Sequence, residues 1–341
     1  MRNFWACCRA RFTLAVLAAL TGLGLGLAAA PPPRPRPAVG PSGALSLVLN
    51  ALTLRNLGPF RSGSWLTSIA VPDAPAHAHL YTIWIGERSG GVWKTTNGGV
   101  SWDPVFDSTG VESIGALAIA PSDPDTVWVG TGDNANARSS YSGKGVFKTS
   151  DGGKTWQAMG LADSQHIARI VIDPRNPEVV YVAALGNLFS KNTERGVFKT
   201  SDGGRSWSKV LYVNDETGAV DLVMDQQAPG TLYAAMYDKQ RLPWRLIEGG
   251  TESGIYRTED GGGHWAKLGG GLPAGTLGRI GLDLYQKNPK ILYALVENLN
   301  PRAGVDETAR AANPATAGGA PPRGVIGNEL YRTDDGGQSW R

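Results

Sequence analysis

Cysteine is almost absent from this sequence, since its 341 residues include only Cys7 and Cys8, both near the start. The rest of the chain therefore offers no thiol for a disulfide, a thiolate nucleophile or a cysteine-containing zinc site. Histidine is scarce as well, and of the four histidines only His77 and His79 lie together. The glycine runs lack the strand-to-helix context of nucleotide-binding loops. We expect no bound metal and no cofactor.

Neither sign of charge dominates the chain. Lys and Arg total 33 and Asp and Glu total 30, which gives a formal net charge of +3. Arg2, Arg9 and Arg11 lie near the start, so the remainder has 33 − 3 = 30 basic against 30 acidic residues. Nucleic-acid binding depends on clustered Lys and Arg facing phosphates. We therefore expect no nucleic-acid partner.

Only one stretch is apolar enough to suggest a membrane or export role. Residues 13–30, TLAVLAALTGLGLGLAAA, follow a basic start and end in three small residues. This pattern predicts a signal peptide over residues 1–30, cleaved after Ala30, with an uncleaved membrane anchor as the alternative. A proline-rich spacer over residues 31–41 follows. We expect a secreted, periplasmic or extracellular protein that is free of the membrane after cleavage.

The rest of the chain repeats one eight-residue segment five times. It occurs as TTNGGVSW, TSDGGKTW, TSDGGRSW, TEDGGGHW and TDDGGQSW, and the closing tryptophans are 54, 51, 58 and 75 residues apart. Such a period indicates a repeat architecture. We call these segments the repeat turns, because the glycine pair supplies the positive φ angles of a hairpin and the Asp or Asn accepts backbone hydrogen bonds. The residues with this structural role are Asn97, Trp102, Asp151, Trp156, Asp202, Trp207, Asp260, Trp265, Asp335 and Trp340.

Each repeat contains four short strand-like segments, such as ALAIAP, TVWVG, GVFKTS and KTWQAM around the second turn. Four antiparallel strands in a repeat of about fifty residues are typical of one β-propeller blade. We predict an all-β chain with a propeller over residues 42–341, about five blades ending near residues 102, 156, 207, 265 and 340, and a low-complexity loop at 300–324. No strand follows the fifth turn, so we expect a fragment of a longer protein. Closure of a five-bladed ring by ALSLVLNALTL near the start is the alternative.

The repeat turn matches the Asp-box, or BNR repeat. The surrounding segments LRNLGPFRSG, GVWKTTNGG, HIARIVIDPRNPEVVYVAALG and GIYRTEDGG resemble the N-terminal propeller of bacterial secreted proteins of the sortilin/VPS10-like group. The resemblance runs from about Leu54 to the end of the chain. Proteins of this group are often labelled glycosyl hydrolases because of the repeats alone.

The candidate binding residues lie on the connections between the second and third strand of each blade, which open on the face opposite the repeat turns. By our register these connections span residues 86–91, 130–145, 183–196, 235–254 and 295–329. Their lengths differ while the repeat turns stay constant, as in scaffolds whose function lies in loops. The segment DKQRLPWR resembles a sugar or peptide site, with a solvated loop as the alternative. The candidates are Asp133, Asn134, Arg138, Tyr237, Arg241 and Trp244.

A second set of candidates comes from the innermost strands. Counted at one register, the five repeats place Ser68, Ala116, Arg169, Asp221 and Arg279 at the same level of the central channel. Two interpretations remain open for the three charged residues. One is a structural Arg–Asp–Arg ion network, because unpaired buried charges are costly. The other is a site that binds an anionic or polar ligand through charge-assisted hydrogen bonds.

These patterns favour a module that binds a protein, peptide or glycan through the face opposite the repeat turns. The alternative is a xyloglucanase-like glycoside hydrolase, since VWVGTGDNANARSSYSGKGVFK resembles the early blades of such enzymes. An inverting glycosidase needs two carboxylates about 6.5–9.5 Å apart. In such enzymes the pair is divided between two propellers, so this chain would hold at most one of the two carboxylates. Asp133 and Asp221 are the catalytic candidates.

Overall fold

The computed structural model describes residues 64–73, 77–135, 140–304 and 324–341, which all belong to one compact unit, 56–341. The predicted leader and spacer lie outside the described residues, as do residues 305–323 of the predicted low-complexity loop. The described chain forms five antiparallel sheets in sequence order. Their strands are β1 (Leu66–Ala70), β2 (Ile83–Glu87), β3 (Gly91–Thr95), β4 (Asp103–Pro104), β5 (Ile114–Ala120), β6 (Asp123–Thr131), β7 (Val146–Thr149), β8 (Gln157–Ala158), β9 (Ile167–Ile172), β10 (Val180–Ala184), β11 (Gly196–Thr200), β12 (Ser208–Leu211), β13 (Thr217–Met224), β14 (Leu232–Leu242), β15 (Arg245–Glu248), β16 (Gly254–Thr258), β17 (Ala266–Lys267), β18 (Leu277–Leu284), β19 (Leu292–Pro301) and β20 (Val325–Thr333).

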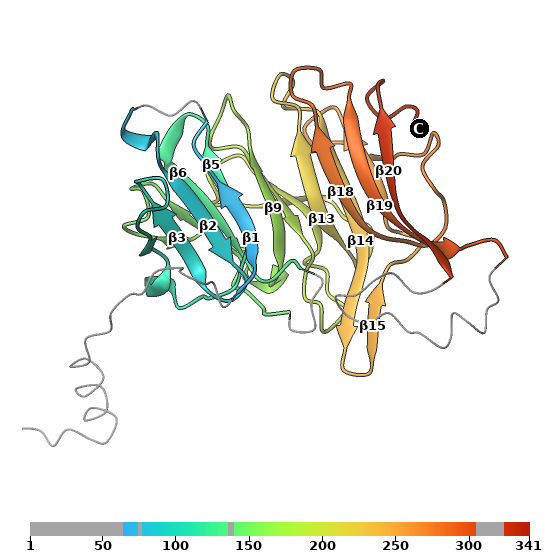
Figure 1. The fold of residues 1–341 in the computed structure, drawn as a ribbon, viewed down its shortest axis with the longest axis horizontal. Coiled ribbons are helices and arrows are strands. Elements are labelled where there is room, and N and C mark those ends of the chain that lie inside the picture. The colour runs from blue at the N-terminus through green and yellow to red at the C-terminus, as the bar shows by residue number, and fades with distance from the viewer. Residues whose placement is uncertain (1–63, 74–76, 136–139, 305–323) are drawn as a thin grey trace, which may run out of the picture. The chain divides into compact units, whose positions relative to one another are not determined.

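The five sheets are the blades of a β-propeller, which confirms the predicted fold class. The innermost strands β1, β5, β9, β13 and β18 pack against one another in order, and Figure 1 shows the sheets following each other in this sequence. Helix in the described part is limited to three single 3-10 turns, η1 (His77–His79), η2 (Asp107–Thr109) and η3 (Ala162–Ser164). None of the described helices has the length and apolarity needed to cross a membrane.

Two blades differ from the four-strand pattern. In the fourth blade, β14 continues to Leu242 and pairs with the additional strand β15, so the segment that we predicted as a loop at 235–254 is largely a hairpin. Figure 1 shows this hairpin projecting from the end of the sheet. In the fifth blade the described residues form three strands, β18, β19 and β20. There β19 extends to Pro301 and β20 begins at Val325, which also shortens the predicted 295–329 loop.

The repeat turns share one internal hydrogen-bond pattern. In the second turn, the Thr149 hydroxyl donates to Asp151 Oδ1 (2.7 Å) and accepts from the Gly153 amide (3.0 Å). Asp151 Oδ1 also accepts from the Thr155 amide (2.9 Å), and Oδ2 accepts from the Thr155 hydroxyl (2.6 Å). These hydrogen bonds, that from the Thr155 hydroxyl first, hold the pKa of Asp151 below its usual range. Asn97 replaces Asp in the first turn and still accepts from the Ser101 amide at 3.0 Å.

Each repeat turn after the first packs on the preceding blade. The contact is an aromatic ring on the second strand covered by a cation from the third strand, which we call the aromatic–cation pair. Lys94 Nζ lies 4.7 Å from the Trp84 ring centre and donates to the Gly152 carbonyl at 2.9 Å. The equivalent pairs in the next three blades are Trp128–Lys148, Tyr181–Lys199 and Tyr233–Arg257.

The tyrosine pairs bind the following turn directly. The Tyr181 hydroxyl donates to the Gly261 carbonyl (2.9 Å) and the Tyr233 hydroxyl donates to the Gly336 carbonyl (3.0 Å). The closing tryptophan adds a second link, because Trp156 Nε1 donates to the carbonyl of Val105 in the first blade at 2.7 Å. The repeat turn is therefore both a hairpin and the connection between blades.

The second glycine of the turn should be irreplaceable for two reasons, its positive φ and the neighbouring ring. Gly153 has φ 91°, and a Cβ there would lie 2.8 Å from Trp84 Cη2. We expect Gly153→Ala to lower the free energy of unfolding by clearly more than the ~1–2 kcal/mol of left-handed backbone strain. The control is Gly110→Ala, since Gly110 has φ 65° and a Cβ there meets nothing within 4 Å. Denaturant unfolding of both variants tests this, and equal losses would contradict the ring contact.

Candidate functional site

All five innermost strands are irregular at one level. Their pairing with the second strand shifts register between Leu66 and Ser68 in β1, and a shift occurs at the equivalent place in the other four blades. A β-bulge leaves one residue unpaired and redirects the side chains beside it. The residues beside these bulges line a central cavity of about 180 Å³. This places the five residues of our predicted register, with Arg169, Asp221 and Arg279 among them, around one space.

The predicted ion network forms only in its first half. Arg169 Nε lies 3.0 Å from Asp221 Oδ1, and the second oxygen, Oδ2, accepts from the Leu282 amide at 2.9 Å. Arg279 makes no ion pair with Asp221 in the described structure; its Nη1 donates to the Asn134 carbonyl at 2.6 Å. The interpretation as an Arg–Asp–Arg network is therefore wrong for Arg279, because its side chain reaches a loop residue of the second blade.

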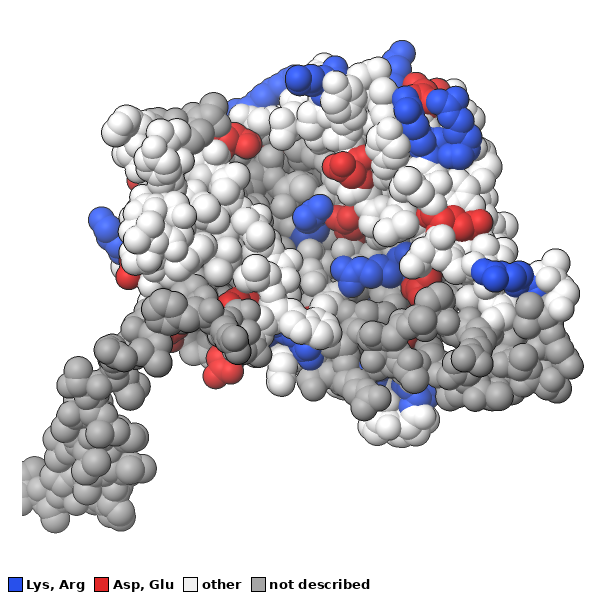
Figure 2. Space-filling view, viewed as in Figure 1, with Lys and Arg blue, Asp and Glu red and all other residues white. Residues whose placement is uncertain are grey.

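Asn134 closes the cavity from the loop side. Its Nδ2 donates to the carbonyls of Gly115 (2.8 Å) and Ala168 (3.0 Å), which belong to the second and third blades. Together with the bond from Arg279 it joins three blades across the channel. Charged side chains of both signs are visible in the hollowed middle of the molecule in Figure 2. Asn134 thus has a structural role here, and its predicted ligand contact stays a prediction.

A second group of polar and aromatic side chains lies where the first two blades meet. Arg88 Nε donates to Asp133 Oδ2 at 2.7 Å, and the Asp133 side chain is fully buried. The Arg88 guanidinium lies 5.1 Å from the Trp65 ring centre and 5.4 Å from that of Tyr141. The buried carboxylate thus fixes the guanidinium, and the guanidinium contacts two rings that are 59% and 49% exposed. We call Trp65, Arg88, Asp133 and Tyr141 the aromatic cluster.

The environment of Asp133 argues against the catalytic role that we considered. Burial raises the pKa of its carboxyl, although the Ala135 amide and Arg88 act in the opposite direction. Its oxygens accept from Arg88 and from the Ala135 amide (2.8 Å), and its side chain has no exposed surface. A glycoside could not reach this carboxylate without displacing Arg88. Asp133 is a positioning residue for the aromatic cluster.

The residues of the predicted DKQRLPWR site lie partly inside the sheet and partly at the exposed hairpin tip. Tyr237 is 1% exposed inside β14, so its assignment to an exposed loop is wrong. Lys239 is also buried and pairs with Glu248 Oε1 of β15 at 2.8 Å, and burial lowers the pKa of its ammonium. Arg241 lies in β14 with its side chain partly exposed. Trp244 is 80% exposed at the hairpin tip, and Arg138 lies outside the described residues.

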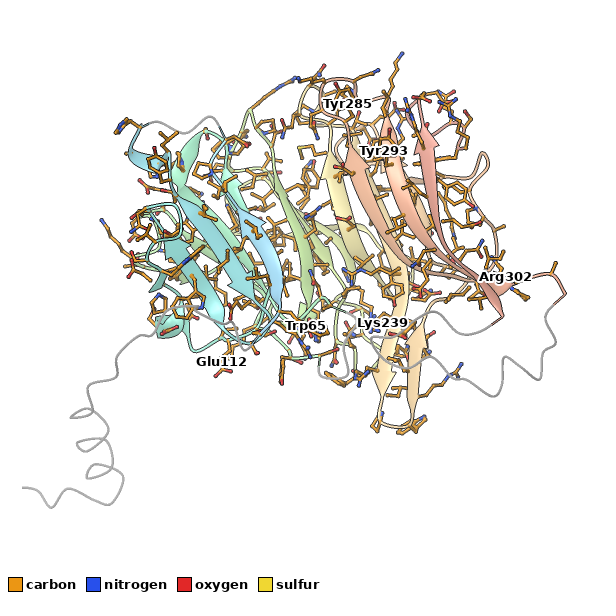
Figure 3. All side chains as sticks on the ribbon, in the orientation of Figure 1. Trp65, Glu112, Lys239, Tyr285, Tyr293 and Arg302 are labelled. Atoms are coloured by element: carbon orange, nitrogen blue, oxygen red, sulfur yellow. The ribbon has the colours of Figure 1, made fainter. Side chains whose placement is uncertain are left out.

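Exposed aromatic residues gather on one face. We call it the loop face, and define it by the connections between second and third strands, including the β14–β15 hairpin, and by the crossings into each innermost strand. Of the seven exposed aromatic residues in the described chain, five lie on these connections, namely Trp65, Tyr141, Phe189, Tyr212 and Trp244. Figure 3 shows Trp65 and Lys239 near one end of the sheets and Tyr285 at the other.

Sequence reasoning missed Trp65, Arg88 and Glu297. Trp65 directly precedes a predicted strand, and Arg88 lies in the shortest of the predicted connections, 86–91, from which no candidate residue was chosen. Glu297 is in β19, its Oε2 accepts from the Arg279 amide at 3.1 Å, and burial raises the pKa of its carboxyl. For Trp65 the available signal in the sequence was a tryptophan directly before a predicted strand. The other two depend on contacts between blades, which one sequence does not display.

Fold and site together define a β-propeller with a constant face of repeat turns and a variable loop face. The Sortilin-Vps10 family, described as sortilin, neurotensin receptor 3, matches residues 90–241. The predicted resemblance to sortilin/VPS10-like propellers, often labelled glycosyl hydrolases, is thereby confirmed.

Two curated relatives are named as xyloglucanases. A xyloglucanase from Paenibacillus sp is 26% identical over 227 residues, which is 57% of this chain and 20% of the relative. A xyloglucanase from Acetivibrio thermocellus is 27% identical over 231 residues, 57% of this chain and 24% of the relative. The chain thus aligns with between a fifth and a quarter of the length of these enzymes.

Solved structures support the same fold. The GH74 enzyme of Niastella koreensis has a TM-score of 0.56 at 16% identity and covers 81% of this chain and 38% of its own. An ancestral GH74 enzyme has a TM-score of 0.54 at 19% identity, covering 82% of this chain and 31% of its own. At these identities the likeness concerns the fold.

One buried histidine gives the molecule a predicted acid sensitivity. His166 is fully buried, its Nδ1 lies 2.9 Å from the Gly186 carbonyl, and burial lowers the pKa of its ring to about 4. Because the folded pKa lies below the unfolded value of about 6.5, stability is complete above pH 6.5 and declines toward pH 4, by about 3 kcal/mol in total. We expect His166→Gln to lose less stability than the wild type between pH 7 and pH 4.5 in denaturant titrations. The exposed His77→Gln serves as control, and an equal loss in wild type and His166→Gln would contradict this origin.

Proposed function

We propose that this protein binds a polysaccharide chain on the loop face. The observation that carries the proposal is the gathering of exposed aromatic rings there, with Trp65 and Tyr141 held by Arg88 above buried Asp133. Exposed aromatic rings offer flat apolar surface at low entropic cost, which suits the faces of sugar rings. The three contacts around Arg88 hold the two rings ready before a ligand arrives.

The favoured ligand is a neutral β-glucan such as xyloglucan. Aromatic stacking needs no charge on the ligand, and the sequence beyond the first eleven residues carries no net charge. The relatives named as xyloglucanases support this ligand class. A protein or peptide ligand, which the sequence alone left open, is the alternative. We place this binding outside the cell, following the predicted leader.

Two tyrosines of equal exposure allow a matched test. Tyr141 on the loop face and Tyr285 in the β18–β19 connection are both 49% exposed. We expect Tyr141→Ala to weaken xyloglucan binding about tenfold, corresponding to ~1.4 kcal/mol, because one stacking ring is removed. Tyr285→Ala should bind as the wild type does. Calorimetry with xyloglucan oligosaccharides measures both, and equal effects of the two variants would contradict binding on the loop face.

A second candidate function is glycoside hydrolysis, favoured by the similarity to xyloglucanases. Asp221 is the better of our two predicted carboxylates, because it lies at the central cavity with its side chain 15% exposed. Its oxygens are engaged by Arg169 and by the Leu282 amide, as in a structural group. If the chain hydrolyses xyloglucan, release of reducing ends should vanish in Asp221→Asn while binding persists. If the wild type binds xyloglucan without releasing reducing ends, hydrolysis is contradicted and the proposed binding function stands.

A further inference from the structure

The wall of the central cavity carries more positive than negative charge. The charged residues that line its volume of about 180 Å³ are Arg169, Asp221 and Arg279, which are two cations and one anion. Arg169 Nε lies 3.0 Å from Asp221 Oδ1, so these two charges neutralise each other. The positive charge of Arg279 therefore has no matching carboxylate in the wall of the cavity.

The guanidinium of Arg279 has unused hydrogen-bond donors. In the part of the chain that the structure describes, its one hydrogen bond runs from Nη1 to the Asn134 carbonyl at 2.6 Å. A guanidinium presents several N–H donors in a planar fork and has no acceptor. The Arg279 side chain is partly buried and lines the cavity, so its remaining donors are available to an acceptor there.

Two carboxyls outside the cavity wall interact electrostatically with Arg279 without binding its guanidinium. Asp133 is held by Arg88 Nε at 2.7 Å. Glu297 Oε2 accepts from the backbone amide of Arg279 at 3.1 Å. Neither carboxyl forms an ion pair with Arg279 in the described structure. The direct partner of this guanidinium can therefore be a ligand.

The size and wall of the cavity suit one small polar group. Gly115 and Gly281 line it together with Thr67 and Ser68, so the wall is narrow in side chains and carries hydroxyl groups. The volume exceeds the ~30 Å³ share of one water molecule in the liquid. It lies below the ~300 Å³ at which pockets for whole drug-sized ligands begin. The Arg169 side chain is 49% exposed, so solvent reaches the cavity, which Figure 2 shows as a hollow with charged side chains.

We propose that the central cavity binds the carboxylate of a small organic acid, with Arg279 as its charge partner. A carboxylate is planar and accepts parallel hydrogen bonds from the fork of a guanidinium. The single unmatched positive charge fits a monoanion, whereas a dianion such as sulfate would leave one negative charge unpaired. The site lies in the channel, goes beyond the proposed polysaccharide binding on the loop face and does not depend on it.

Ser68 provides a matched pair of test variants. It holds the position of Asp221 in the first blade, and its Oγ accepts from the Leu117 amide at 3.0 Å. Ser68→Asp adds a negative charge to the wall and should weaken acetate binding about tenfold or more, because like charges repel. Ser68→Asn has nearly the same shape without the charge and should bind acetate as the wild type does. NMR titration with sodium acetate at constant ionic strength measures both, and equal affinities of the two variants would overturn the proposal.

Three further probes identify the chemical class of the ligand. Glucuronate and glucose differ at one carbon, which is a carboxylate in the first and a hydroxymethyl group in the second. We expect glucuronate to bind and glucose not to bind. Glucuronate affinity above that of acetate would identify a sugar acid as the source of the carboxylate, and equal affinity would identify small acids in general. Binding of glucose as tightly as glucuronate, or of sulfate more tightly than acetate, would overturn the proposal.

A second variant keeps the test decisive if Ser68→Asp does not fold. In Arg279→Gln the side-chain amide can still donate to the Asn134 carbonyl, but the charge is lost, and acetate binding should weaken about tenfold or more. Tyr141→Ala should retain acetate binding, which separates this site from the proposed polysaccharide site. Absence of acetate and glucuronate binding to the wild type, or unchanged acetate binding by Arg279→Gln, would overturn the proposal.

Discussion

The structure depends on the contact between each glycine-pair turn and the aromatic–cation pair of the blade before it. The contact leaves no room for a Cβ, because the ring of Trp84 or Trp128 would lie 2.8 or 2.7 Å from a Cβ on Gly153 or Gly204. A positive φ alone would permit an occasional Asn, whereas close packing on a ring requires glycine. Packing on the ring of the preceding blade therefore requires the second glycine in the second and third turns.

This contact also sets the position of the sites. The turns fix one end of each blade against the previous one, so the innermost strands follow at constant offset and their bulges reach the same level. Arg169, Asp221 and Arg279 consequently surround one cavity although they are 52 and 58 residues apart in sequence. The opposite ends of the blades carry no such constraint, and there the connections differ in length and in aromatic content. Constancy at one end thus permits variation at the loop face.

The repeating parts of the fold could be predicted from sequence, and the non-repeating parts could not. Strand positions, the turn hydrogen bonds and the level of the three charged residues all follow from one period. The partner of Arg279 is Asn134, which lies in a connection that no other repeat resembles. The β14–β15 hairpin could not be predicted, because its two-residue connection, Pro243 and Trp244, lacks the Gly, Asn or Asp that marks two-residue hairpin turns. Burial of Asp133 depends on Arg88 from another blade.

The central claim is that the preceding blade, and not the turn's own hydrogen bonds, stabilises the repeat turn. Native-state hydrogen exchange tests it directly, because all five turns donate an equivalent amide to a threonine hydroxyl: Gly99 to Thr95 at 3.0 Å and Gly153 to Thr149 at 3.0 Å. A Cβ on Gly99 would meet only Trp102 of its own turn. We predict that the Gly153, Gly204, Gly262 and Gly337 amides exchange only through global unfolding, whereas Gly99 exchanges by local opening at far lower free energy. Equal protection of all five amides would contradict the account.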